Sequence, residues 1–286
     1  MDFTVARRPP MPYQDVEIGE LIAIWDTAVT DLIDVAEAAG PDQWATPTPC
    51  PGWSVGDLVA HVVSLERFLM GRADPPHTPD YDSLPHAQSG LSRYTEIPVD
   101  LRRSRSRDDV LAEARATAAD RLAELSAGPQ SPDAEVMGVF GKPMRLRSLL
   151  RMRIFDTWIH EQDVRVAIDQ AGHLGTPPAW VTAGGFVRSL AAAWAGRAGA
   201  PEGAVARFVT TGPEVTFDVL VAAVADGRGA LIQTGPRPDV TVELSWPDLI
   251  ALGAGRVPPQ EGLRRAVLSG DVPLAEALVT NLSTTP

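Results

Sequence analysis

The chain has 286 residues, enough for two ordinary domains, and its content of 44% hydrophobic and 22% charged residues is typical of a globular protein. The net charge of −12 argues against nucleic acid as a partner, because phosphate binding needs a basic surface. The sequence contains no apolar run long enough to span a bilayer and no recognisable signal peptide, and Cys50 is its only cysteine, so we expect a cytoplasmic protein without disulfides.

Apolar residues recur at helical spacing in four segments of the first half of the chain. Ser54, followed three residues later by Asp57, predicts the start of the second helix, and Gly172 predicts the end of the fourth. Residues 73–106 are polar and contain proline, which predicts a long irregular loop that is either functional or mobile. Four amphipathic helices predict an up-and-down bundle over residues 1–172. These helices are expected at 16–39, 55–70, 107–125 and 146–171.

The second half of the chain changes from helical to β-rich character. An apolar helix at 181–198 is interpreted as a bridge within residues 173–204. Residues 205–286 predict a small α+β domain, so the whole chain is assigned to the α+β class. Its strands are expected at 207–211, 215–221, 229–234 and 240–244, and its helices at 246–254, 263–268 and 273–282.

One histidine and one acid–histidine pair are the candidate metal ligands. Asp156 and His160 are four residues apart and therefore share a helix face, while His61 lies within another helix of the same bundle. Two imidazoles and a carboxylate with an open position can hold a catalytic divalent ion. The spacing alone leaves two alternatives open, a core histidine at position 61 and an internal ion pair between Asp156 and His160. A buried carboxylate without a counter-charge is destabilising, which favours the metal.

Two blocks of the sequence resemble the signatures of one family. Residues 48–61, Thr-Pro-Cys-Pro-Gly-Trp-Ser-Val-Gly-Asp-Leu-Val-Ala-His, are similar to the first signature of the mycothiol-dependent maleylpyruvate isomerase family, and residues 153–165 resemble the second. The resemblance implies a DinB-like metal-binding four-helix bundle followed by a sterol-carrier-like domain. It also implies that His61, Asp156 and His160 hold Zn²⁺ or another divalent ion. The isomerase itself uses glutamate as its acidic ligand, which is one methylene longer than Asp156.

The resemblance also implies a cosubstrate and a reaction. The family uses mycothiol, a small thiol of actinobacteria, and the presence of one lysine, Lys142, among 25 basic residues is consistent with a GC-rich source. A thiol bound to zinc loses its proton readily, and the thiolate then attacks a small electrophilic substrate. The result is either isomerisation or S-transfer. Arg256 resembles a Gly-Arg element of the family's second domain, so it is the candidate for binding a substrate carboxylate; a solvated loop arginine is the alternative.

Two other functions remain open at this point. A metal that activates water would make the protein a hydrolase or amidase of thiol conjugates, whereas a bundle that serves only as a scaffold would leave a non-catalytic small-molecule carrier. The expected partners are mycothiol and a small electrophile, without nucleic acid or membrane. The expected assembly is a monomer or a small homo-oligomer.

Several other residues receive a structural and a functional interpretation. Cys50 lies between two prolines and is expected to pack as a structural loop residue. Asp163 and Arg165 follow the candidate ligands on the same helix. They form either a salt bridge at the helix end, or Asp163 is the acceptor that orients a ligand histidine. The 73–106 loop would cover the metal if it is functional. It contains His77, His86 and Tyr94.

Overall fold

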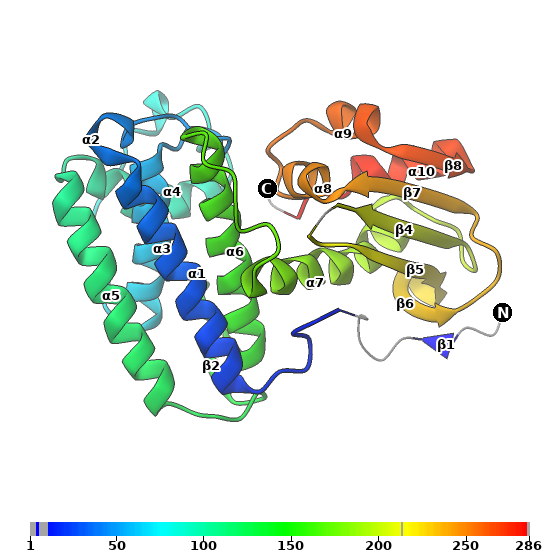
Figure 1. The fold of residues 1–286 in the computed structure, drawn as a ribbon, viewed down its shortest axis with the longest axis horizontal. Helices are drawn as coiled ribbons and strands as arrows, with labels where there is room; N and C mark the ends of the chain where they lie inside the picture. The colour runs from blue at the N-terminus through cyan, green and yellow to red at the C-terminus, as the bar shows by residue number, and fades with distance from the viewer. Residues whose placement is uncertain (1–3, 6–10, 213, 285–286) are drawn as a thin grey trace. The chain divides into compact units, whose positions relative to one another are not determined.

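The computed structural model describes residues 4–5, 11–212 and 214–284 (Figure 1). These residues form two compact units, one made of residues 16–173 and the other of residues 174–284 together with the described residues before Val16. The first unit is mainly helical and the second combines a sheet with helices, so the predicted α+β class is confirmed. Among the described residues, no helix is both long enough and apolar enough to cross a membrane.

The helical unit is built on four long helices that run side by side in Figure 1. They bury a common core that includes the fully buried residues Trp25, Leu58, Ile154 and Trp158. Burial of such large apolar side chains stabilises the bundle by about 1.5–3 kcal/mol for each one. The four helices are α1 (Ile18–Ala38), α3 (Val55–Leu69), α5 (Arg107–Ala127) and α6 (Leu146–Ala167), and the one-turn helix α2 (Gly40–Gln43) follows α1.

The ends of α3 and α6 set the positions of the candidate ligands. The predicted capping box starts α3, because the Asp57 amide donates to Ser54 Oγ over 3.3 Å and the Ser54 amide donates to Asp57 Oδ2 over 2.9 Å. Helix α6 ends at Ala167, earlier than predicted, since the chain turns at Asp169 with a φ of 56°. The candidate ligands therefore lie in the interior of both helices. There the backbone is held by the hydrogen bonds of the helix itself.

The prediction of an irregular loop throughout residues 73–106 is wrong. This segment contains the short 3₁₀ turn η1 (Tyr81–Ser83) and the helix α4 (Gly90–Arg103), which packs on α3. The buried residues of α4 include Glu96 and Arg102, so its inward face is partly charged and gives no apolar period. Pro98, inside α4, makes the helix still harder to predict, because an interior proline usually interrupts a helix. A hairpin of β2 (Glu135–Met137) and β3 (Pro143–Arg145) then joins α5 to α6.

The second unit contains a sheet with the strand order β1-β6-β5-β4-β7-β8. Its four predicted strands are confirmed, and neighbouring strands are antiparallel except for the parallel pair β4 and β7. The helix predicted at 263–268 is wrong, since α9 ends at Arg265 and Leu268 lies in a strand that pairs with β7. The strands are β1 (Thr4–Val5), β4 (Val205–Thr211), β5 (Phe217–Val224), β6 (Arg228–Thr234), β7 (Val240–Ser245) and β8 (Val267–Gly270), and the later helices are α8 (Trp246–Gly253), α9 (Pro259–Arg265) and α10 (Val272–Thr280).

Residues 174–204 belong to the same unit as the sheet and do not form a separate bridge. Helix α7 (Pro177–Ala191) and the π-helical turn η2 (Ala192–Arg197) pack on β5 and β6. The contact is close: a Cβ on Gly229 would lie 2.0 Å from the carbonyl oxygen of Ala191. Glycine is therefore required at this point of β6, and the apolar face of α7 forms part of the core of the second unit.

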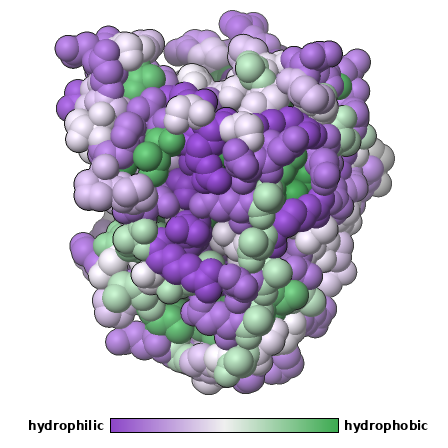
Figure 2. Space-filling view, turned by 90° about the vertical axis from the view of Figure 1, so that its left-hand side faces the viewer, coloured by the Kyte–Doolittle hydropathy of each residue, from purple (hydrophilic) through white to green (hydrophobic). Residues whose placement is uncertain are grey.

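One face of the helical unit is mainly polar. Figure 2 views the molecule from the side where α5 lies in Figure 1 and shows hydrophilic residues over most of that face, with hydrophobic residues in small separate groups. Such a face indicates exposure to solvent, in keeping with the net charge of −12.

Candidate metal centre

Three candidate ligands from two helices lie within reach of one ion. Helix α3 carries His61, and α6 carries Asp156 and His160 one turn apart. His61 Nε2 lies 3.3 Å from Asp156 Oδ2, and His160 Nε2 lies 3.6 Å from Asp156 Oδ1. One ligand atom from each residue falls within 4.8 Å of the other two. The structure thus brings together all three residues that the sequence singled out.

A buried arginine holds the carboxylate of Asp156 in place. Arg153, one turn earlier on α6, donates from Nη1 to Asp156 Oδ2 over 2.7 Å and from Nε to Glu66 Oε1 over 2.8 Å. Glu66 also accepts a hydrogen bond from the indole of Trp25. Arg153 and Glu66 are 2% and 1% exposed, so their charges neutralise each other inside the unit. Arg121 Nε also lies 3.5 Å from Glu66 Oε2, so Glu66 is shared by two arginines and Arg153 supplies a counter-charge to Asp156 that the sequence interpretation did not include.

Burial and neighbouring charges set the protonation states of the centre. Burial by itself raises the pKa of Asp156, but the charge of Arg153, followed by those of the two histidines, outweighs it and holds that pKa well below its usual range. Burial lowers the pKa of His61, and the opposing effect of Asp156 does not cancel the shift. The centre thus favours an ionised carboxylate and a neutral His61, which are the forms that bind metal ions.

The two imidazoles differ in how they are oriented. His160 Nδ1 lies 3.2 Å from Oδ2 of the buried Asp163, an arrangement that places the proton on Nδ1 and leaves the Nε2 lone pair toward Asp156. The structure therefore agrees with the orienting role considered for Asp163. His61 Nδ1 is buried and has no hydrogen-bond partner within the described part of the chain. Its ring is held instead by packing.

Trp53 forms one wall of the centre. Its ring centroid lies 4.8 Å from that of His61 and 5.9 Å from that of His160. Its indole N–H donates to Oε2 of the fully buried Glu96 on α4 over 2.7 Å. The close approach of Gly52 to the His86 ring, with a φ of 78°, allows the loop before Trp53 to reach α4. His86 and Arg103 also pair with the Glu96 carboxylate.

Sequence reasoning missed the charged groups around the three ligands. Arg153 precedes Asp156 by three residues in the second signature block, and a helical i,i+3 spacing places them on one face. Glu66 follows Val62 by four residues, so it is an acid on the apolar face of α3. An acid and a base on the inward faces of two neighbouring helices are a usable signal of a buried pair. Glu96 gave no such signal, because α4 itself was not predicted.

The geometry of the donor atoms fits a divalent ion. In a tetrahedral zinc site with bonds of about 2.0–2.1 Å, neighbouring donor atoms lie roughly 3.3 Å apart. His61 Nε2 and His160 Nε2 approach different oxygens of Asp156, at 3.3 Å and 3.6 Å, and both separations are close to that edge. Two neutral imidazoles and one carboxylate are a donor set that zinc accepts.

A pocket of about 320 Å³ reaches His61 within the helical unit. Its walls come from α3, from residues 72–77 and from the first half of α4, and they include Phe68, His77 and Tyr94. The volume is at the lower end of the range for small-molecule sites. The part of residues 73–106 that was expected to cover the metal thus supplies two pocket walls.

Two other groups of potential ligands surround the centre. Cys50 is half-buried, and its sulfur lies within 4.8 Å of ligand atoms of His160 and Asp163. Asp31, Glu161 and His173 form the other group, but the Arg165 guanidinium donates to Glu161 over 2.7 Å and lies 2.8 Å from His173 Nδ1. A cation already occupies that second group, so we do not consider it a metal site.

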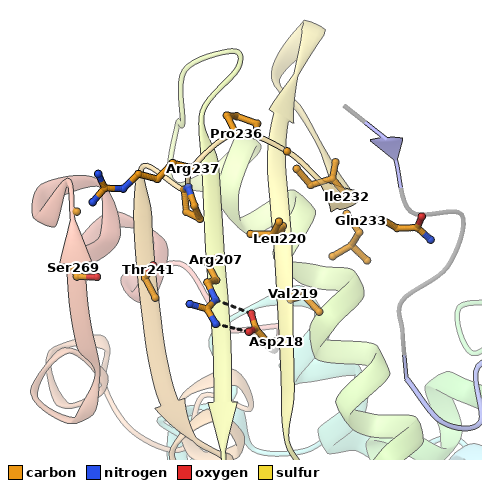
Figure 3. Close-up of a pocket in the computed structure, with 14 residues that line it drawn as sticks. Arg207, Asp218, Val219, Leu220, Ile232, Gln233, Pro236, Arg237, Thr241 and Ser269 are labelled. Carbon is orange, nitrogen blue, oxygen red and sulfur yellow. Dashed lines mark hydrogen bonds and ion pairs between the residues drawn. The ribbon is translucent and has the colours of Figure 1, made fainter. Parts of the chain in front are cut away.

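The remaining candidate residue, Arg256, lies in the second unit. It follows α8, is half-buried, and donates from Nη1 to the carbonyl oxygen of Ala254 over 2.8 Å. Its role toward a substrate stays a prediction. The same unit also contains a groove of about 820 Å³ over the face of the sheet that Figure 3 shows in front of the helices. The Arg207–Asp218 ion pair crosses this groove, and Leu220 and Ile232 contribute apolar surface.

Comparison with known proteins agrees with the fold of the helical unit. The model of the mycothiol maleylpyruvate isomerase N-terminal domain matches residues 25–165, which include all three candidate ligands. Two crystal structures of mycothiol-dependent maleylpyruvate isomerase, one of them of a mutant, share the fold at 17% sequence identity. The mutant has a TM-score of 0.54, with 89% of this chain and 94% of that one covered. The other has a TM-score of 0.51, with 85% and 91% covered.

Two curated relatives extend the comparison by sequence. Both are uncharacterized proteins of Mycobacterium tuberculosis, one from strain CDC 1551 / Oshkosh and one from strain H37Rv. Each is 28% identical over 142 residues, which are 49% of this chain. The matching stretch spans about half the length of these relatives, 54% of each. Residues 25–165 thus match the N-terminal domain of the mycothiol maleylpyruvate isomerase family.

Proposed function

We propose that the protein is a divalent-metal-dependent enzyme that uses mycothiol to attack a small electrophile, as an S-transferase or an isomerase. His61, Asp156 and His160 would hold the ion, with Zn²⁺ the first candidate. The observation that carries the proposal is the convergence of these three donors, at separations of 3.3 Å and 3.6 Å, beside a pocket of about 320 Å³ that reaches His61.

The residues of the chain divide the work around such an ion. When bound, a divalent cation at this position lowers the pKa of a thiol and so provides a thiolate at neutral pH. Asp163 holds His160 in the tautomer that presents Nε2. Arg153 fixes the Asp156 carboxylate, and Glu66 neutralises Arg153. Trp53 packs beside both imidazoles and limits the access of water from its side.

The cosubstrate brings the sulfur that the reaction needs. A thiol cosubstrate explains how the chain would work with a single cysteine, Cys50, that is half-buried in a proline-rich loop. The solved relatives are named for an isomerase of maleylpyruvate, which is therefore the first substrate to test. Arg256 is proposed to bind a carboxylate of such a substrate, because its planar fork suits bidentate pairing.

Metal analysis followed by a thiol titration tests the proposal. Purified protein should contain close to one divalent ion per chain, and the cobalt-substituted form should develop thiolate-to-metal absorbance on addition of mycothiol. The His160→Ala variant should lose both signals while keeping its helical content. Turnover of thiol conjugates without added thiol would point to the hydrolase, and a metal-free wild type that stays metal-free after incubation with Zn²⁺ would refute the proposed centre.

The groove of the second unit favours a carrier as the second candidate. Its volume of about 820 Å³, its apolar residues Leu220 and Ile232 and its charged rim suit a mixed apolar and ionic ligand. A carrier keeps its ligand when the metal centre is removed. Binding of an anionic fluorescent naphthalene probe to a variant in which His61, Asp156 and His160 are all alanine, together with its loss in Leu220→Asp, would support the carrier over the enzyme.

A further inference from the structure

A second histidine–carboxylate pair lies in the pocket that reaches His61. His77 Nε2 is 2.7 Å from Asp100 Oδ2, and both His77 and His61 line the pocket of about 320 Å³. The His77 side chain is 29% exposed, so its ring is open to a molecule in the pocket. Nothing in the proposed metal centre uses this pair.

The network behind His77 determines which of its nitrogens is free. Asp100 also accepts a hydrogen bond from Arg103 Nη1 over 3.0 Å, and Arg103 pairs in turn with Asp57 over 3.0 Å. Burial by itself raises the pKa of Asp100, but the hydrogen bonds from His77 and Arg103 outweigh it and lower that pKa. An ionised Asp100 accepts the Nε2 proton of His77. Nδ1 has no partner among the described residues and is left with its lone pair.

A partly exposed imidazole that lines a pocket and has one nitrogen held by a carboxylate is the arrangement of a general base. A loop that only needed to be fastened to α4 would not require a titratable group on the pocket wall. The 72–83 segment has other attachments to α4, including the hydrogen bond from Tyr81 Oη to the Arg93 carbonyl over 3.2 Å.

We propose that His77, oriented by Asp100, is the proton-transfer residue of the thiol reaction in this pocket, an inference that rests on the function proposed above. The thiol S–H bond breaks and its proton goes to His77 Nδ1, and the resulting thiolate sulfur then forms a bond to the electrophilic carbon. In S-transfer, the bond from that carbon to the leaving group breaks, the leaving group keeps the electron pair, and the imidazolium releases its proton to solvent. In isomerisation, the carbon–sulfur bond breaks again after rotation and the proton returns to sulfur.

The environment of His77 contains both signs of charge. Asp100 and Tyr94 approach it from α4, and Arg103 does so through Asp100. Its own segment contributes Arg72 and Asp74 to the same pocket, where Arg72 pairs with Asp120 and Asp74 pairs with Arg102. Helix α3 contributes His61. A pH profile of the reaction thus includes the ionisations of these groups. The contribution of His77 is identified by comparing the wild-type profile with the profiles of matched variants.

Steady-state kinetics of the zinc-loaded enzyme with mycothiol tests the proposal, with maleylpyruvate and monochlorobimane as electrophiles. His77→Gln keeps an amide N–H toward Asp100 but has no base, so kcat should fall by roughly 10²-fold or more and one ionisation should vanish from the pH profile. Asp100→Asn should lower kcat on the order of tenfold or more, because the tautomer is no longer imposed. Cobalt–thiolate absorbance should remain in both variants.

The matched control is Tyr81→Phe, which loosens the same segment from α4 outside the pocket and should leave kcat and the pH profile unchanged. Nitrogen-15 NMR of histidine gives a readout apart from activity and should show the His77 proton on Nε2. Wild-type kcat in His77→Gln, or a proton on Nδ1, would overturn this inference and leave the proposed function standing. A zinc-loaded wild type that turns over neither electrophile would refute the proposed function and this inference together.

Discussion

Two buried charge clusters of the helical unit differ in how completely their members are paired. Arg102, 3% exposed, donates two hydrogen bonds to Asp74 over 2.7 Å and 2.8 Å and two to Glu113 over 3.0 Å and 2.9 Å. In the cluster of His61, Asp156 and His160, Asp156 faces both imidazoles and accepts from Arg153, and Asp163 faces His160 alone, whereas His61 Nδ1 lacks a partner among the described residues.

The contrast separates a structural charge cluster from a functional one. Around Arg102 the guanidinium fork is filled by carboxylates, so a further ion would gain no donor. At the Asp156 centre a nitrogen of each imidazole approaches the same carboxylate, and His61 Nδ1 has no partner in the described part of the chain. Buried polar groups in folded proteins are normally satisfied, so an incompletely paired cluster beside a pocket indicates a place for a ligand.

The largest expected effect comes from removing a ligand of the cluster formed by His61, Asp156 and His160. His160→Ala should reduce bound zinc from near one per chain to background, because a carboxylate and one imidazole give too few protein donors for a stable site. Thermal stability of the metal-free variant should stay close to that of the metal-free wild type. Elemental analysis after dialysis measures the first quantity and calorimetry the second. Full zinc occupancy in the variant would show that the ion binds elsewhere.

Removing Arg102, the buried cation of the other cluster, should change the stability of the fold and not the zinc content. Arg102→Met leaves Asp74 and Glu113 with the more exposed Arg67 as their shared partner, and breaking a buried ion pair from one side destabilises a protein by up to about 3–5 kcal/mol. Urea denaturation followed by helical circular dichroism measures this loss. Zinc content should be unchanged, and a combined loss of zinc and stability would mean that the two clusters are not independent.

A smaller effect is expected at the residue that orients His160. Asp163→Ala removes the acceptor of Nδ1, and loss of such a partner typically weakens metal affinity by about 10- to 100-fold. Competition with a chromophoric chelator measures the affinity. Arg165→Ala is the control, because Arg165 pairs with Glu161 and His173, outside the centre. Equal affinities for the two variants would contradict an orienting role of Asp163.

The smallest expected effect is the pH dependence of the stability that the Arg102 cluster contributes. Burial by itself raises the pKa of Asp74 and Glu113, but Arg102 outweighs it and holds both pKa values below their usual range. Lowered carboxyl pKa values stabilise the fold above the unfolded pKa values of about 4, and this stability is lost as the pH falls through the folded values. The stability difference between wild type and Arg102→Met should therefore shrink from pH 6 to pH 3. Urea denaturation across that range measures it.

The outline of the fold follows from patterns that are local in the sequence. The apolar periods of α1, α3, α5 and α6, the Ser54–Asp57 cap and the four alternating strands of the second half are all visible in the sequence. Helix α4 is not, since it buries Glu96 and Arg102, whose inward positions depend on partners distant in the chain. The strand β8 is missed for a related reason: its assignment depends on pairing with β7.

The sequence by itself determined which residues are the candidate ligands, because the i,i+4 spacing of Asp156 and His160 follows from helix geometry alone and His61 lies in a recognisable signature. Only the tertiary structure decided that His61 meets them, that Arg153 and Glu66 neutralise each other beside them, and that His77 shares their pocket. Those contacts join residues that are tens of positions apart. Such distances are set by the packing of whole helices, which no local periodicity specifies.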